Sequence, residues 1–154
     1  PLLLIIPKGR EKETIKRLAR VGFDKTLGYL NGGFTSWKDA GKKIDYINTI
    51  SPKKFEEKSK KKLLRVYDVR KSFEFNTSHL KNSINIPLNN LSQKINDSEK
   101  ENELFLHCQT GYRSMIASSL LKIKGYKNVN DIDGGFIALK SYGIKTFSSK
   151  NLVN

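Results

Sequence analysis

The feature that most constrains the fold is a run of residues that changes from strand to helix around a single cysteine. Leu104-Phe105-Leu106 is a short apolar run typical of a buried parallel strand, and residues 114–124 carry apolar side chains at helical spacing. Between them Gly111 allows a sharp turn of the backbone, and Gly125 predicts the end of the helix. The sequence therefore predicts a strand, a tight loop and a helix, as expected in an α/β fold.

Cys108, the only cysteine of the chain, stands where this strand ends, which is the edge at which α/β sheets place their sites. Backbone N–H groups of the loop would curl around the sulfur, and the positive end of the following helix would point at it. Arg113 adds a positive charge. All three effects favour the thiolate, so we expect a lowered pKa and a nucleophile or sulfur carrier rather than a structural core cysteine.

The spacing between the cysteine and the arginine distinguishes two classes of reaction. Cysteine-dependent phosphatases have five residues between the two, whereas four residues separate Cys108 from Arg113. We expect the smaller ring of amides to suit a terminal sulfur better than a tetrahedral phosphate. Residues 108–114 form the pattern Cys-x-x-Gly-x-Arg-Ser, which resembles the active loop of rhodanese sulfurtransferases. In that family the cysteine takes a sulfane sulfur from thiosulfate or a persulfide and passes it to a thiol or cyanide.

Other segments resemble the same family and follow in its order along the chain. They are Asp68-Val69-Arg70, Glu74, His79-Leu80, Asn85-Ile86-Pro87-Leu88 and Asp133-Gly134-Gly135-Phe136. One departure is Leu80, where the family usually has isoleucine. The resemblance implies a thiosulfate sulfurtransferase of rhodanese type, with a rhodanese-like parallel sheet flanked by helices.

An internal repeat extends this organisation to the start of the chain. Gly22-Phe23 and Gly32-Gly33-Phe34 recur as Gly125-Tyr126 and Gly134-Gly135-Phe136. The first copy has Pro7-Lys8-Gly9-Arg10-Glu11 in place of the cysteine loop. We therefore predict three regions: the back half of an inactive rhodanese-like unit over residues 1–48, a complete active domain over residues 49–144, and a tail over residues 145–154.

The incomplete first copy predicts a missing partner. A strand at Leu2 to Ile6 would be central in a whole unit, and half a sheet leaves an unpaired edge. The two copies in this order, with Arg-Leu-Ala-Arg-Val-Gly-Phe-Asp at residues 17–24, are similar to the C-terminal region of metallo-β-lactamase-fold proteins fused to rhodanese domains (persulfide dioxygenase type). We expect such a domain upstream in a longer parent or, for the isolated chain, a homodimer.

The resemblance assigns roles to the loop. Cys108 is the sulfur acceptor, and Gln109, Thr110, Gly111, Tyr112 and Ser114 form the substrate-binding loop, the first four through backbone amides. By strand alternation His107 points away from the cysteine, so we expect a buried, hydrogen-bonded histidine rather than a catalytic base. We expect His79 to be structural as well.

Two arginines and an aspartate complete the predicted site. Arg113 either binds an anionic donor or fixes the loop through Asp68, since an arginine fork suits sulfonate-like oxygens and carboxylates equally. Arg70 either faces the substrate or forms a structural salt bridge with Glu74.

Composition narrows the remaining possibilities. The net charge is +14, yet no RNA-binding aromatic motif accompanies it, so we expect a solvated basic surface that attracts small anions rather than nucleic acid. A single cysteine excludes a disulfide framework and favours a reducing cytoplasm, and the apolar runs are too short to span a bilayer. The chain lacks a His-x-His-x-Asp-His motif, so we expect no metal and no other cofactor.

The leading hypothesis is sulfur transfer by double displacement between small sulfur donors and thiol acceptors. Two alternatives stay open: a phosphatase or arsenate reductase with a shortened loop, and a non-catalytic rhodanese module that regulates a partner.

Overall fold

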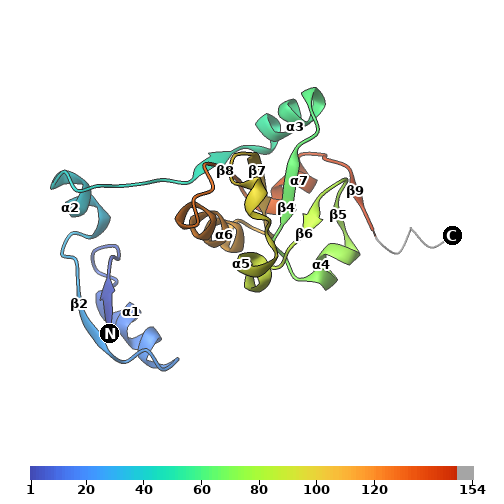
Figure 1. Ribbon diagram of the computed structural model, residues 1–154. Helices are drawn as coiled ribbons and strands as arrows, with labels where there is room; N and C mark the ends of the chain where they lie inside the picture. The colour runs from blue at the N-terminus through green and yellow to red at the C-terminus, as the bar shows by residue number, and fades with distance from the viewer. Residues whose placement is uncertain (149–154) are drawn as a thin grey trace. The chain divides into compact units, whose positions relative to one another are not determined.

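The computed structural model describes residues 1–148 (Figure 1). The chain divides into two units, Pro1–Tyr46 and Ile47–Asn154. In the part that the structure describes, no helix is long and apolar enough to cross a membrane.

A five-stranded sheet, parallel at every pairing, forms the centre of the second unit. In spatial order its strands are β3 (Asn48–Ile50), β8 (Asn128–Ile132), β7 (Glu103–His107), β4 (Arg65–Asp68) and β6 (Ile84–Asn85). The α-helices are α3 (Pro52–Lys61), α4 (Ser72–Thr77), α5 (Leu91–Lys94), α6 (Tyr112–Ile123) and α7 (Gly135–Ser141), with 3₁₀ turns η1 (Leu88–Asn90) and η2 (Asp97–Glu99). The α/β class and the parallel sheet flanked by helices are thus confirmed.

Strand β7 carries the core because both of its faces are covered. Leu104, Phe105 and Leu106 are each 0% exposed. Leu104 and Leu106 pack in one cluster with Leu91 of α5 and Leu121 of α6. Phe105 packs on the other face in a second cluster, whose helical members are Phe55 of α3 and Phe136 and Leu139 of α7. Burial of each such side chain stabilises the fold by about 1.5–3 kcal/mol. Because β7 is the central strand, its carboxyl end lies at the middle of that edge of the sheet.

Local signals in the sequence account for the helix starts. Ser51 caps α3, accepting a hydrogen bond from the Lys54 amide at 3.3 Å, and Pro52 takes the first helical position. Strand β8 takes Val129 and Ile132 into the core, where each is buried.

Three short segments differ from the sequence prediction. The sequence predicts an extended connector over residues 44–50, but its last three residues, Asn48–Ile50, form the edge strand β3, because Ile50 is buried against the sheet and Asn48 hydrogen bonds Asn130. The sequence predicts a loop over residues 79–83, but its first two residues, His79–Leu80, form strand β5, which pairs antiparallel with β9 (Thr146–Phe147) in the predicted tail. Two-residue ladders are too short to show a period in sequence. The rest of that tail, residues 149–154, lies outside the described residues.

The first unit contains β1 (Leu2–Leu4), α1 (Glu11–Ala19), β2 (Thr26–Tyr29) and α2 (Gly33–Asp39). Strands β1 and β2 pair in parallel. Gly33 is the only buried residue among residues 1–46, and Leu3 and Leu27 are 79% and 67% exposed. This unit therefore has the elements of an α/β motif without an enclosed core of its own.

Candidate active site

Cys108 directly follows β7 at the carboxyl edge of the sheet, and α6 begins four residues later at Tyr112. Gly111 has a φ of 111°, a left-handed conformation that side chains rarely adopt, and this allows the loop to close under the helix. The Cys108 side chain is 1% exposed. The loop therefore holds its single thiol beneath the start of a twelve-residue helix.

Hydrogen-bond donors surround the sulfur. The Gly111 amide donates to Sγ at 3.2 Å, and the Ser114 hydroxyl lies 3.6 Å from Sγ and also donates to the Gly111 carbonyl at 3.1 Å. Burial, the largest single influence, raises the pKa of Cys108. Hydrogen bonds from the Ser114 hydroxyl and from the Ser114, Thr110 and Gly111 amides more than offset it, so the pKa is lowered. The site therefore favours the thiolate.

The predicted ring of amides is recognisable but differs in its members. Thr110 and Gly111 contribute as expected, and the Ser114 amide joins them. The Gln109 side chain accepts a hydrogen bond from Arg70 at 3.2 Å. The Tyr112 side chain is 84% exposed, so it projects from the loop rather than covering the thiol.

Arg113 is bound to a different carboxylate from the one expected. Its two terminal nitrogens donate to the two oxygens of Glu74 at 2.7 and 2.9 Å, so the predicted link to Asp68 is wrong. Glu74 is the third residue of α4, and its carboxylate also accepts the Lys71 amide. The pair forms because the first turns of α4 and α6 both lie at the edge of the sheet where Cys108 stands. The pKa of Arg113 is raised, chiefly by its hydrogen bonds to Glu74 and to a smaller extent by Cys108.

Arg70 is buried, and its guanidinium is bound by groups of the protein itself. It is 2% exposed and forms a salt bridge with Asp68 at 2.6 Å, in place of the predicted bridge with Glu74. The guanidinium also donates to the Ser78 carbonyl at 2.7 Å and lies 3.9 Å from the centre of the Phe136 ring. Asp68 is completely buried at the end of β4, where an unpaired charge would be costly. The guanidinium of Arg70 supplies the opposite charge.

Each of the two histidines contacts other groups of the protein rather than the Cys108 sulfur. His107 is 0% exposed, its Nδ1 lies 3.3 Å from the Cys108 carbonyl oxygen, and burial lowers its pKa. The expectation of a buried histidine facing away from the sulfur agrees with this position. His79 stacks on Phe75. Neither imidazole contacts Sγ through a described hydrogen bond, and no group of three metal-ligating side chains comes together within residues 1–148.

The turn between β8 and α7 also belongs to the site, a role that the family resemblance at residues 133–136 did not assign to it. The Phe136 and Ile137 amides donate to the carbonyls of Cys108 and Gln109 at 2.7 and 3.1 Å. A Cβ at Gly135 would stand 2.6 Å from the Cys108 carbonyl oxygen, so only glycine permits this approach. The signal was present: two glycines follow the strand that neighbours β7 in a parallel sheet.

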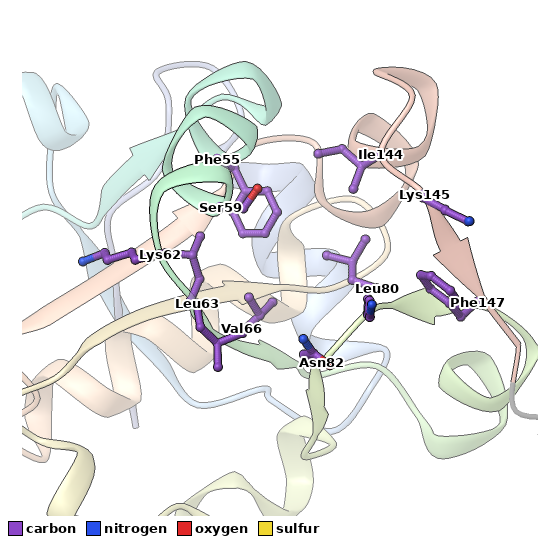
Figure 2. A pocket seen from close by; sticks show the side chains of 12 residues that line it. Phe55, Ser59, Lys62, Leu63, Val66, Leu80, Asn82, Ile144, Lys145 and Phe147 are labelled. Atoms are coloured by element: carbon purple, nitrogen blue, oxygen red, sulfur yellow. The ribbon is translucent and has the colours of Figure 1, made fainter.

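A groove of about 380 Å³ opens elsewhere on the second unit. Figure 2 shows Phe55 of α3, Val66 of β4 and Leu80 of β5 around it, with Lys62 and Lys145 at its border. None of its lining residues belongs to the 108–114 loop. The groove therefore lies apart from the cysteine loop.

Comparisons with known proteins agree with this geometry. The family model for the rhodanese-like domain matches residues 51–141, more than half of the chain. The uncharacterized protein YqhL of Bacillus subtilis is 31% identical over 104 residues, which cover 68% of this chain and 79% of that protein. The adenylyltransferase and sulfurtransferase UBA4 of Saccharomyces cerevisiae is 35% identical over 80 residues, covering 45% of this chain and 18% of the yeast protein.

A solved structure shows the same fold. The rhodanese-related protein of Thermoplasma volcanium is 30% identical, with a TM-score of 0.59, and the match covers 65% of this chain and 97% of that one. The chain spans 58% and 29% of the lengths of two further curated relatives. With the family model, the sheet order and the cysteine loop in agreement, the chain belongs to the family of rhodanese-like domains.

Proposed function

We propose that the second unit is a sulfurtransferase that carries a sulfane sulfur as a persulfide on Cys108. The observation that carries the proposal is the set of donors aimed at one buried sulfur: the Gly111 amide at 3.2 Å and the Ser114 hydroxyl at 3.6 Å. These donors, with the N-terminus of α6, stabilise an anionic sulfur without any general base. A family relationship to a sulfurtransferase supports the same reading.

The reaction would take place in two displacements. The Cys108 thiolate attacks the outer sulfur of thiosulfate, the sulfur–sulfur bond of the donor breaks, and sulfite leaves with the electron pair. The terminal sulfur of the new persulfide then carries the negative charge within reach of the loop amides. A thiol or cyanide attacks that sulfur, takes it as a persulfide or thiocyanate, and returns Cys108 to the thiolate. A low-molecular-weight persulfide could replace thiosulfate as donor.

Arg113 would act at the entrance to the loop. Its salt bridge with Glu74 holds the start of α6 against α4, and its charge interacts with Cys108. An anionic donor would be attracted by the cation, while the Glu74 carboxylate reduces the net charge that the donor meets. The amides and the helix therefore supply most of the stabilisation of the persulfide, with Arg113 fixing their geometry.

The test is intact-mass measurement after incubation with thiosulfate. We expect the protein to gain one sulfur atom, to lose it to cyanide as thiocyanate, and to do neither as Cys108→Ser. An unmodified mass in the wild type would contradict the proposal. It would favour a non-catalytic module instead, a reading that the 1% exposure of Cys108 supports. Turnover of an aryl phosphate that Cys108→Ser abolishes would favour the phosphatase reading.

We propose in addition that the region predicted over residues 1–48, of which the structure places Pro1–Tyr46 in the first unit, is the back half of an inactive rhodanese-like unit, completed by another segment or by a second copy of the chain. The support is the repeated Gly-Gly-Phe pattern and the exposed Leu3 and Leu27. An upstream metallo-β-lactamase-fold domain is the finer form of this proposal and rests on the sequence resemblance alone, because the family match begins at residue 51. Size determination of the natural full-length protein would test it.

A further inference from the structure

The groove on the second unit has an apolar floor and a border of lysines (Figure 2). Phe55 of α3, Val66 of β4 and Leu80 of β5 lie in the floor, and all three are buried members of one core cluster. The packing of the sheet therefore forms this floor. Leu63, which also lines the groove, is 80% exposed. The groove thus offers apolar surface to another molecule.

The groove continues into a second hollow of about 680 Å³. The lining that the two hollows share consists of Lys81, Asn82, Lys145 and Phe147. Asn82 has a φ of 60°, the left-handed conformation, and turns the chain shortly after β5. Together the two hollows, here called the combined hollow, extend from the C-terminal end of α3 to strand β9. A surface of this extent fits a stretch of peptide chain better than a compact small molecule.

Among the described residues, three lysines and no carboxylate line the combined hollow. The ammonium group of Lys62 lies 2.8 Å from the Glu103 carboxylate, which neutralises part of its charge. The ammonium group of Lys145 lies 5.6 Å from the centre of the Phe147 ring. Neither Lys81 nor Lys145 forms an ion pair with any of residues 1–148. The border therefore carries positive charge that this part of the chain leaves without a carboxylate.

Charge distinguishes between the occupants that the combined hollow could receive. A second copy of the chain would bring a net charge of +14 towards the same lysines. Residues 149–154 of the chain contain one lysine and no acidic residue. A segment of another protein whose acidic side chains flank apolar ones would meet the lysines with opposite charge and the floor with apolar surface. Charge complementarity therefore favours an acidic partner.

We propose that the combined hollow is the docking groove for an acidic peptide segment of a partner protein. Apolar side chains of the segment would lie against Leu63 and Phe147, and its carboxylates would pair with Lys81 and Lys145. None of the residues that line the hollow belongs to the 108–114 loop. The inference therefore stands independently of sulfur transfer at Cys108.

The first test is selection of binders to the whole chain from a phage-displayed library of random peptides. We expect the selected peptides to carry aspartate or glutamate on both sides of apolar residues, because the lysines border an apolar floor. Their binding should weaken as the salt concentration rises, since the lysines are exposed. Selected peptides without acidic residues would overturn the proposal, and so would a selection that yields no binder.

Charge reversal then locates the binding site. Lys81→Glu combined with Lys145→Glu should weaken binding of the most enriched peptide, measured by fluorescence anisotropy, by about tenfold or more. The same peptide with its acidic residues replaced by lysine should bind this variant better than the wild type. The matched control is Lys53→Glu with Lys94→Glu, an equal charge change at two exposed lysines that line neither hollow. Equal weakening by both pairs would reduce the effect to net charge and overturn the proposal.

Leu63→Ser tests the apolar part of the contact. Because this side chain is 80% exposed, its removal should leave the fold intact and weaken peptide binding severalfold. An unchanged affinity would contradict an apolar contact at this position and, with it, the proposed partner.

Two measurements test the other occupants. A chain that ends at Ser148 should bind the peptide as the whole chain does, and a large gain in affinity would show that residues 149–154 occupy the groove. A peptide that separates associated copies of the chain in light scattering would assign the groove to self-association. Either result would overturn the proposal. Cys108→Ser should bind the peptide as the wild type does, so failure of the proposed function, an unchanged mass after thiosulfate treatment, is distinguishable from failure of docking.

Discussion

The same strand, loop and helix occur in both units, and the two loops bind different anions. In the second unit the Gly111 amide donates to the Cys108 sulfur at 3.2 Å; in the first, the Gly9 amide donates to the Glu11 carboxylate at 3.0 Å. Backbone amides lower the pKa of both side chains. They are the main cause of the shift at Glu11, whereas at Cys108 they act together with the Ser114 hydroxyl and against the effect of burial. Anion binding is therefore a property of the motif, whereas chemistry depends on which anion the sequence places there.

The turns that close the two motifs are also alike. Gly32 and Gly33 have φ values of 77° and 61°, and Gly134 and Gly135 have 66° and 59°. A Cβ at Gly33 would stand 2.5 Å from the Ile6 carbonyl oxygen, as one at Gly135 would stand 2.6 Å from that of Cys108. Each second glycine thus permits a helix start to pack on the loop after the paired strand.

What the two motifs do not share is a set of neighbouring strands. Strand β7 lies between β4 and β8, and its Leu104 and Leu106 are fully buried. Strand β1 pairs with β2 alone in the first unit, and its Leu3 is 79% exposed. The comparison teaches that the local motif sets the geometry of the loop, while the outer strands and the helices they bring supply the burial.

The largest difference between the two motifs should appear when the second glycine of each closing turn, Gly135 or Gly33, is replaced. Gly135→Ala forces a side chain into a left-handed conformation and against the Cys108 carbonyl, which should cost about 3 kcal/mol or more. We expect hydrogen exchange of the β7 amides to accelerate and persulfide formation to fall.

The matched change is Gly33→Ala, which meets the same obstacle in the first unit. It should alter the fluorescence of Trp37, the only tryptophan and a residue of α2. It should leave the exchange of the β7 amides unchanged. Equal acceleration of β7 exchange by both variants would contradict a separation of the two motifs.

The arginines that follow the two loops give the next comparison. Arg113→Lys keeps the charge but loses the planar fork that binds both oxygens of Glu74. Sulfur transfer per unit of thiosulfate should fall about tenfold or more, roughly 1.4 kcal/mol. Arg10→Lys, which alters an exposed pair with Glu13, should leave the rate unchanged. A near-wild-type rate for Arg113→Lys would mean that the loop amides and the N-terminus of α6 support sulfur transfer without the arginine fork.

The exposed sheet of the first unit should promote self-association. Leu3→Lys places a charge on the unpaired strand, so light scattering over a range of concentrations should show less association than in the wild type. Leu63→Lys, at an 80% exposed leucine of the second unit, is the control and should have little effect. A wild-type chain that stays monomeric at every concentration would exclude pairing through β1.

The fold and the cysteine loop could be predicted because their signals are local. Each signal acts within a few residues of the chain. The apolar run indicates β7, the capping Ser51 indicates the start of α3, and Gly111 indicates the turn before α6. The partners of Arg70 and Arg113 could not be predicted, since either arginine can reach either carboxylate until α4 and β4 are placed in space.

The smallest expected effect concerns the pH dependence of the salt bridge between Arg113 and Glu74 in the second unit. Hydrogen bonding with Arg113 is the main cause that lowers the pKa of Glu74, the Lys71 amide adds to it, and partial burial opposes it. Because the folded pKa lies below the unfolded one, the pair stabilises the fold above the unfolded pKa and stops doing so as the pH falls through the folded pKa. Glu74→Gln removes this contribution, so chemical denaturation should show the wild type more stable at neutral pH, by about 1 kcal/mol or less for a partly exposed pair. The difference should shrink towards acid pH. A difference that stays constant with pH would assign the stability to packing rather than to the charge of Glu74.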